Sequence, residues 1–175
     1  QISMEQQCGN TSEVQCHRWP AHIAKNMAES IHQQVLETLS QSRLVRKTDG
    51  IKFVRKDDIV RVENILGSGA FSQVSAVSCK DGRRYACKHL KQTLMSQPGN
   101  FRSAAAELAC EAHMLASFDH PNILKIRGWA QNGVASFEDG WHNSFFLLLD
   151  VLDETLDQRI ERWQVEAHNV LSVLI

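Results

Sequence analysis

The sequence predicts an α+β fold, in which a five-stranded antiparallel sheet packs against one long helix. Short apolar runs separated by turn residues recur between Phe53 and Leu149. Apolar residues at helical spacing run from about Phe101 to Phe118. Two glycines one residue apart, Gly67 and Gly69, stand between two of the apolar runs. This glycine pair therefore belongs to the tip of a strand-loop-strand and does not open a helix.

The composition limits the classes of function. The 175 residues suffice for one domain or one and a half, and a hydrophobic content of 43% supports a packed core. A net charge of -1 favours neither nucleic acid nor a membrane surface as a partner. Five cysteines without a C-x-x-C pair favour reduced thiols, and hence a cytoplasmic location with the nucleus as the alternative.

Residues 1–50 are predicted to be a partly helical N-terminal extension. Because the chain begins with Gln1 and shows no signal-peptide pattern, we interpret its start as cut. Cys8, Cys16 and His17 lack a suitably spaced fourth ligand, so no metal site is expected there. The segment Ala21–Leu44 is expected to be a helix that packs on the lobe, binds a partner or serves as a linker, with packing preferred. Its predicted apolar face consists of Ile23, Met27, Ile31, Val35, Leu36 and Leu39. A basic cluster is interpreted as a solvated face and comprises Arg43, Arg46, Lys47, Lys52, Arg55 and Lys56.

Strands, turns and a helix follow in a clear order after residue 50. An Asp-Gly pair, Asp81-Gly82, predicts a tight hairpin turn. Pro98 precedes the predicted helix, and Pro121 follows its end. The segment between Gln131 and Asn143 is predicted to be a polar loop. The five expected strands are Ile59–Leu66, Val74–Cys79, Arg84–Leu90, Ile123–Ile126 and Phe145–Leu149.

The glycine loop allows three interpretations. A dinucleotide-binding fingerprint would require a third glycine where Ser72 stands, a helix after the loop and a later acidic residue. A P-loop is excluded because no Gly-Lys-Ser or Gly-Lys-Thr occurs. The third interpretation is a glycine-rich hairpin that binds no ligand. A loop of exposed N–H groups suits a phosphate, and Lys88 on a neighbouring strand supplies a compact positive charge.

The order of the motifs resembles that of the eukaryotic-type protein kinase family over about Phe53 to Trp163. We assign the resemblance to the N-lobe of a serine/threonine kinase, although the residues that decide the acceptor would lie in the missing lobe. It implies a kinase-like N-lobe and hinge at 51–152, with helix C in the predicted long helix, and the helical start of a truncated C-lobe at 153–175. The matching stretches are Gly67-Ser68-Gly69-Ala70-Phe71-Ser72-Gln73-Val74, Tyr85-Ala86-Cys87-Lys88, Ala104–Leu124 and Phe145–Leu152.

The resemblance also implies roles for individual residues in binding ATP. Lys88 would hold the α- and β-phosphates, and Glu111 would pair with it, with Glu107 as the rival. Leu149 would be the gatekeeper of the adenine slot, and the hinge backbone at Asp150 and Leu152 would bind the base edge. Leu115 and Ile126 resemble the N-lobe part of the family's regulatory spine. The nucleotide-binding residues implied are Leu66, Gly67, Ser68, Gly69, Ala70, Phe71, Ser72, Val74, Ala86, Lys88, Leu149, Asp150 and Leu152.

The function that follows is the ATP-binding part of a kinase that phosphorylates serine or threonine of a protein substrate. No H-R-D or D-F-G occurs in the sequence, so we interpret the chain as truncated and expect it to be inactive alone. No metal ligand is predicted here, and Mg²⁺ is expected only with the missing C-lobe. The alternative is a non-catalytic kinase-like module that binds a partner through the helix around Glu111 or the helix Ala21–Leu44.

Overall fold

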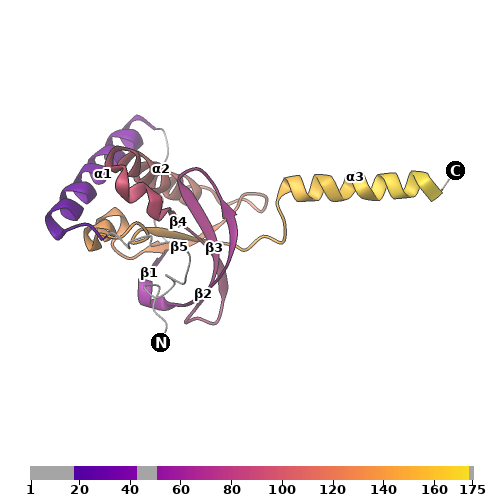
Figure 1. Cartoon of the computed structure of the whole chain (residues 1–175), viewed down its shortest axis with the longest axis horizontal. Helices are drawn as coiled ribbons and strands as arrows, with labels where there is room; N and C mark the ends of the chain where they lie inside the picture. Colours follow the sequence, from indigo (N-terminus) through magenta and orange to yellow (C-terminus); the bar gives the residue numbers. More distant parts are fainter. Residues whose placement is uncertain (1–17, 43–50, 174–175) are drawn as a thin grey trace.

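The computed structural model describes residues 18–42 and 51–173, and side chains up to residue 166 (Figure 1). The predictions for Cys8, Cys16, His17, Arg43, Arg46 and Lys47 lie outside these residues. One sheet with strand order β1-β5-β6-β4-β3-β2 carries two helices, α1 and α2, while α3 extends away from it. The strands are β1 (Lys52–Val54), β2 (Ile59–Ser68), β3 (Ser72–Cys79), β4 (Arg84–Leu90), β5 (Ile126–Ala130) and β6 (Phe146–Leu149). The helices are α1 (Ala21–Gln41), α2 (Pro98–Ala116) and α3 (Leu156–Val173), with short 3-10 helices η1 (Lys56–Asp58), η2 (Gln92–Ser96) and η3 (Gly133–Asp139).

The α+β class is confirmed, but the sheet has six strands and not five. The additional strand, β1, pairs in parallel with β5, so the sheet is not purely antiparallel. The strands were expected to begin near Phe53, which lies in β1. Three residues are too few to show an alternating pattern, so the sequence predicted no separate strand there. Its pairing needs Gly128, because a Cβ there would lie 2.7 Å from Cγ2 of Val54 and 2.8 Å from the carbonyl oxygen of Lys52.

The strands β2, β3 and β4 form an antiparallel meander, as the sequence predicted. The predicted Asp-Gly turn joins β3 to β4, and Gly82 adopts a left-handed φ of 76° there. The Asp81 carboxylate stabilises the turn by accepting hydrogen bonds from the Arg83 amide at 3.1 Å and the Tyr85 hydroxyl at 2.8 Å.

Two segments after α2 differ from the prediction. The expected strand Ile123–Ile126 is wrong, because β5 begins only at Ile126. The preceding residues form a turn, in which the amide of Ile123 donates to the carbonyl of His120 at 3.1 Å. The expected polar loop contains η3, which buries Phe137 and ends at Gly140 with a φ of 79°. The local sequence did not predict η3, because this helix is buried by contact with α1, which lies about a hundred residues earlier.

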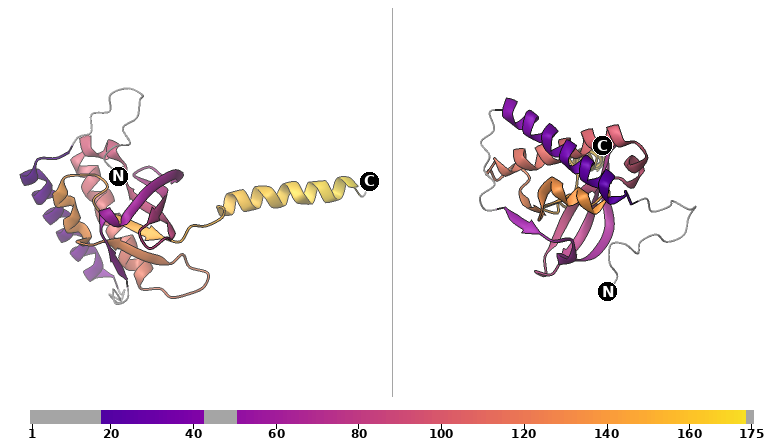
Figure 2. Two further views of the ribbon diagram at one scale, coloured as in Figure 1. Left: turned by 90° about the horizontal axis from the view of Figure 1, so that it is seen from below. Right: turned by 90° about the vertical axis from the view of Figure 1, so that its left-hand side faces the viewer.

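Helix α1 packs on the lobe, which was the preferred of the three alternatives for this segment. Figure 2 shows α1 crossing the same side of the molecule as α2 and η3. The buried stripe differs from the predicted face, since Ile23 is 41% exposed while Ala24 and Ala28 are buried. The alanines let α1 pack closely on the lobe. A prediction based on large apolar side chains does not detect such a face. The buried residues are Ala24, Ala28, Ile31, Val35 and Leu39.

Helix α3 begins with a reciprocal cap in which Thr155 and Gln158 bond each other's backbone amides at 3.2 and 2.8 Å. The predicted helix at this point is confirmed. Its apolar residues Leu156, Ile160 and Trp163 are exposed. None of the helices within residues 18–42 and 51–173 is long and apolar enough to cross a membrane.

Candidate functional site

The glycine turn is the first part of the candidate site. Strands β2 and β3 pair up to Ser68 and Gln73, which leaves Gly69, Ala70 and Phe71 at the tip. The amide of Gly69 donates to the carbonyl of Ser72 at 2.9 Å and closes the turn. Gly69 therefore lies at the tip of a hairpin, with Ala70 and Phe71 exposed beside it, whereas Gly67 pairs with Val74 near the end of β2.

Neither glycine of this turn is required by the fold. Gly67 and Gly69 are not among the glycines with positive φ. A Cβ on Gly67 would meet nothing within 4 Å, and one on Gly69 would meet only Ser72, at 3.8 Å. The absence of side chains thus leaves open space beside the backbone, which is what close approach by a ligand needs.

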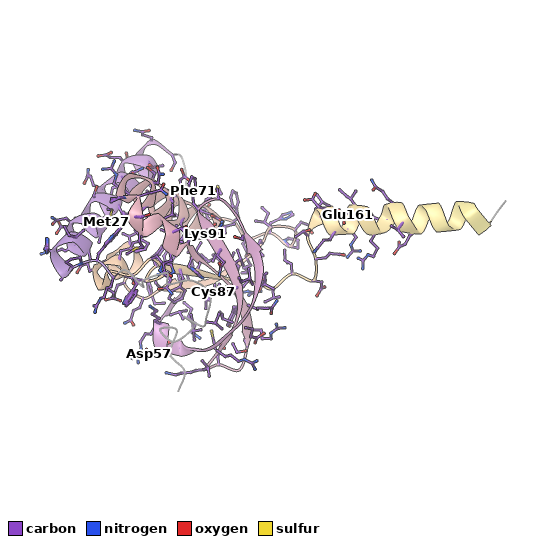
Figure 3. The ribbon with its side chains drawn as sticks, in the orientation of Figure 1. Met27, Asp57, Phe71, Cys87, Lys91 and Glu161 are labelled. Carbon is purple, nitrogen blue, oxygen red and sulfur yellow. The ribbon has the colours of Figure 1, made fainter. Side chains whose placement is uncertain are left out.

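A lysine that the sequence analysis missed holds the tip of the turn. The amide of Lys91 donates to the carbonyl of Phe71 at 2.9 Å, and its Nζ donates to the carbonyl of Gly69. Figure 3 labels Phe71 and Lys91 on this part of the lobe. Lys91 comes just after β4, three residues beyond Lys88. This short distance in the sequence is the one feature that could have identified Lys91 as part of the site. The strand that carries Lys88 therefore also fixes the glycine turn.

An ion pair joins β4 to α2. Nζ of Lys88 lies 2.8 Å from Oε1 and 2.6 Å from Oε2 of Glu111. The side chains are only 22% and 31% exposed, so solvent screens this pair less than an exposed one. Glu107, the rival residue one turn earlier, is exposed. The pair holds the ammonium group in one place on the sheet.

The strand registers place four predicted residues on one face of the sheet. Val74 lies opposite Lys88, and Ala86 lies opposite Leu149. Because side chains alternate along a strand, Val74, Ala86, Lys88 and Leu149 share a face. Ala86 and Leu149 are buried, whereas Val74 is partly exposed. An apolar surface thus lies next to Lys88 on the same face of the sheet.

The other predicted residues lie in β2, in β3 and in the segment after β6. Leu66 and Leu152 are exposed, at 40% and 62%, and come from opposite ends of the site in the sequence. Ser68 ends β2, and Ser72 begins β3. The two residues expected in a regulatory spine, Leu115 and Ile126, are partly buried and buried, respectively.

The segment after β6 is anchored by an arginine that sequence reasoning also missed. Nε and Nη2 of Arg127 donate to the two oxygens of Asp150 at 2.7 and 2.9 Å. This two-bond geometry fixes Asp150 against β5. No local signal points to Arg127, because the contact depends on the pairing of β5 with β6.

The arrangement can bind a molecule that has an anionic end and an apolar, flat end. The ammonium group and the open turn suit phosphates, while the apolar face suits a ring. Among the residues that the structure describes, no group of three histidines, cysteines or carboxylates could hold a metal ion.

Comparison with known proteins identifies the family of the domain that contains this site. The model of the protein kinase domain matches residues 60–173, which include every predicted site residue. Ephrin type-B receptor 4 from Mus musculus is 30% identical over 108 residues, which are 57% of this chain and 11% of the receptor. The receptor of the same name from Homo sapiens is 29% identical with the same coverage. The chain therefore spans only a small part of the length of these relatives.

Proposed function

The chain belongs to the protein kinase domain family, and on that premise we propose that it is the ATP-binding part of a protein kinase. The kinase would transfer the γ-phosphoryl group of ATP to serine or threonine hydroxyls of protein substrates. The observation that carries the proposal is the ion pair between Lys88 and Glu111, beside a glycine turn with free space at its backbone.

The polar end of the site supports binding of the phosphates. Backbone N–H groups of the glycine turn would lie over the triphosphate, and Lys88 would hold the α- and β-phosphates. Glu111 would fix the direction of the ammonium group, so its role is orientation and not net stability. Ser72 in place of a third glycine leaves the two open positions unchanged. Binding at these groups is mainly electrostatic.

The apolar end supports binding of adenine. Ala86 and Leu149 lie side by side on the sheet, and Val74 extends the same face toward the glycine turn. Such a surface excludes water from a flat ring, while backbone groups at Asp150 and Leu152 would bond its edge. The Arg127 pair would keep this segment in place.

Phosphoryl transfer needs a catalytic aspartate and Mg²⁺ ligands in motifs that this sequence does not contain. Kinases use a catalytic-loop aspartate and two sets of Mg²⁺ ligands, but neither H-R-D nor D-F-G occurs here. We therefore expect this chain to bind nucleotide weakly and to transfer no phosphoryl group alone. A cytoplasmic location and Mg²⁺ binding with a C-lobe are part of the same proposal. For a kinase that contains the lobe, phosphoamino-acid analysis would test the acceptor, and phosphotyrosine alone would contradict serine or threonine.

The nucleotide site can be tested on this chain by titration with a fluorescent ATP analogue. We expect Lys88→Met to weaken binding by about tenfold or more, because hydrogen bonds to charged groups contribute about 1.5–3 kcal/mol. Lys125→Met is the control, since Lys125 is exposed and pairs with Asp119 at 3.0 Å, remote in sequence from the glycine turn. Equal losses of affinity in both variants would refute a phosphate role for Lys88.

A second test uses the open space at the glycine turn. Gly67→Val should leave the melting temperature nearly unchanged, because the added Cβ meets nothing within 4 Å, and should weaken binding where a ligand approaches the backbone. Gly99→Val is a matched control, since a Cβ there also meets nothing within 4 Å. Unchanged affinity in Gly67→Val would show that no ligand approaches the turn.

The alternative function, a non-catalytic module that binds a partner, gains no specific support. Glu111 is engaged with Lys88, and the inner face of α1 is buried on the lobe. The Glu111 side chain and the inner face of α1 are thus used within the chain.

A further inference from the structure

Helix α1 lies before the residues that match the kinase domain, yet it belongs to the core of this lobe. Ala24 and Ile31 are completely buried, and Val35 and Leu39 are nearly so. The helix contacts both α2 and η3. An element outside the family match therefore packs directly on the helix that carries Glu111.

The start of α1 is held by a close backbone contact. The amide of Trp19 donates to the carbonyl of Gly140 at 3.0 Å, and Nε of Arg18 donates to the carbonyl of Asp139 at 2.8 Å. A Cβ on Gly140 would lie 2.6 Å from the carbonyl oxygen of Trp19. The Trp19 ring also packs edge-on against Phe101, with centroids 4.6 Å apart. The first residues of α1 and α2 are thereby joined.

Further contacts follow α2 toward Glu111. Nη1 of Arg102 lies 3.5 Å from Oγ of Ser30. Burial raises the pKa of the Cys110 thiol, and the Thr38 side chain lies near enough to this thiol to oppose that rise. Cys110 is the residue directly before Glu111. The contacts of α1 thus run from the first turns of α2 to the turn that forms the ion pair.

The face of α2 that points away from Glu111 borders a cavity. A space of about 430 Å³ is lined by residues of α1, by Ala109 and His113 of α2, and by Trp129 of β5. At 100° per residue, Ala109 and His113 lie on the side of α2 opposite Glu111. Helix α1 supplies four of the residues that line this space, which lies on the side of α2 away from Lys88.

We propose that α1 is a built-in brace that holds α2 in the position where Glu111 pairs with Lys88, without help from a partner protein. Release of α1 would let α2 shift into the cavity and separate the pair. The functional value of this brace rests on the proposed nucleotide site, but the positioning itself does not. The experiments below therefore contain no nucleotide.

The first experiment uses Gly140→Ala in the whole chain, with Gly82→Ala as the matched control. Both glycines have nearly the same left-handed φ, 79° and 76°, but only at Gly140 does a Cβ collide with Trp19. We expect Gly140→Ala to speed hydrogen exchange in residues 104–113 by about tenfold relative to the control, because local opening becomes easier. Labelling of Lys88 by a small amine reagent should rise several-fold, while labelling of Lys125 stays constant.

The second experiment keeps η3 intact and compares Ile31→Ala with Ile23→Ala. Ile31 is fully buried and Ile23 is 41% exposed on the same helix. Only Ile31→Ala should release α2 and increase labelling of Lys88. Faster exchange in α1 alone would overturn the proposal, and so would equal changes in α2 and in strands β3 and β4. If the unmutated chain binds no nucleotide while these experiments give the expected result, only the proposed function is refuted.

Discussion

The stability of this lobe should fall at mildly acidic pH because of His142. Its ring lies edge-on to His89, with centroids 5.9 Å apart, and its Nδ1 is buried with no hydrogen-bond partner among the described residues. Burial, followed by the smaller effects of the charges on His89 and Lys56, lowers the pKa of His142 to about 3. Burial likewise lowers the pKa of His89. Lys56 is held nearby by a hydrogen bond to Asn143 of 3.2 Å.

The sign and size of the effect follow from proton linkage. Between its ordinary pKa of 6.5 and the folded pKa of about 3, His142 binds a proton only in the unfolded chain. Stability is therefore present above the unfolded pKa and is lost as the pH falls through this window. From pH 7 to pH 5, His142 alone should remove about 2 kcal/mol of the free energy of unfolding. His89 acts in the same direction.

The assay is urea denaturation at pH 7 and pH 5, with the free energy of unfolding taken at each. His142→Gln cannot gain this proton, so its loss between the two pH values should be smaller than that of the wild type by about 2 kcal/mol. His22→Gln is the control, because His22 is exposed on α1. An identical loss in wild type and His142→Gln would refute the reasoning.

Three further predictions test the packing of the lobe. Gly128→Ala should cost about 1–3 kcal/mol and release β1 from β5, because a Cβ at 2.7 Å from Val54 is overpacked; unchanged exchange in β1 would contradict this. Phe101→Ala should cost about 3–5 kcal/mol in urea denaturation, since its ring is fully buried, and a loss below 1 kcal/mol would show that the site collapses. Burial raises the pKa of Cys87 to about 12, so mass spectrometry should find it unlabelled by iodoacetamide until the chain unfolds, and rapid labelling of the folded protein would refute its burial.

Much of the lobe could be predicted from local patterns. Alternating apolar residues predicted the meander of β2, β3 and β4, and Asp81-Gly82 predicted its turn because that pair favours a left-handed backbone. The order of the glycine turn, Lys88 and the long helix predicted the family. The proposed division at residues 50 and 152 stays a prediction, as do the individual roles of the residues in nucleotide binding.

The tertiary structure alone decided the elements whose stability comes from distant residues. Strand β1 is too short for a signal of its own and depends on Gly128, while η3 is polar in sequence and buried beneath α1. Lys91 and Arg127 act through a carbonyl and a carboxylate that only the strand pairing brings near. The sequence by itself determined the meander, the helix and the family, because these follow from periodicity and order along the chain. How α1 meets α2, and hence what surrounds Glu111, depended on contacts between residues up to about 120 positions apart, which no local pattern encodes.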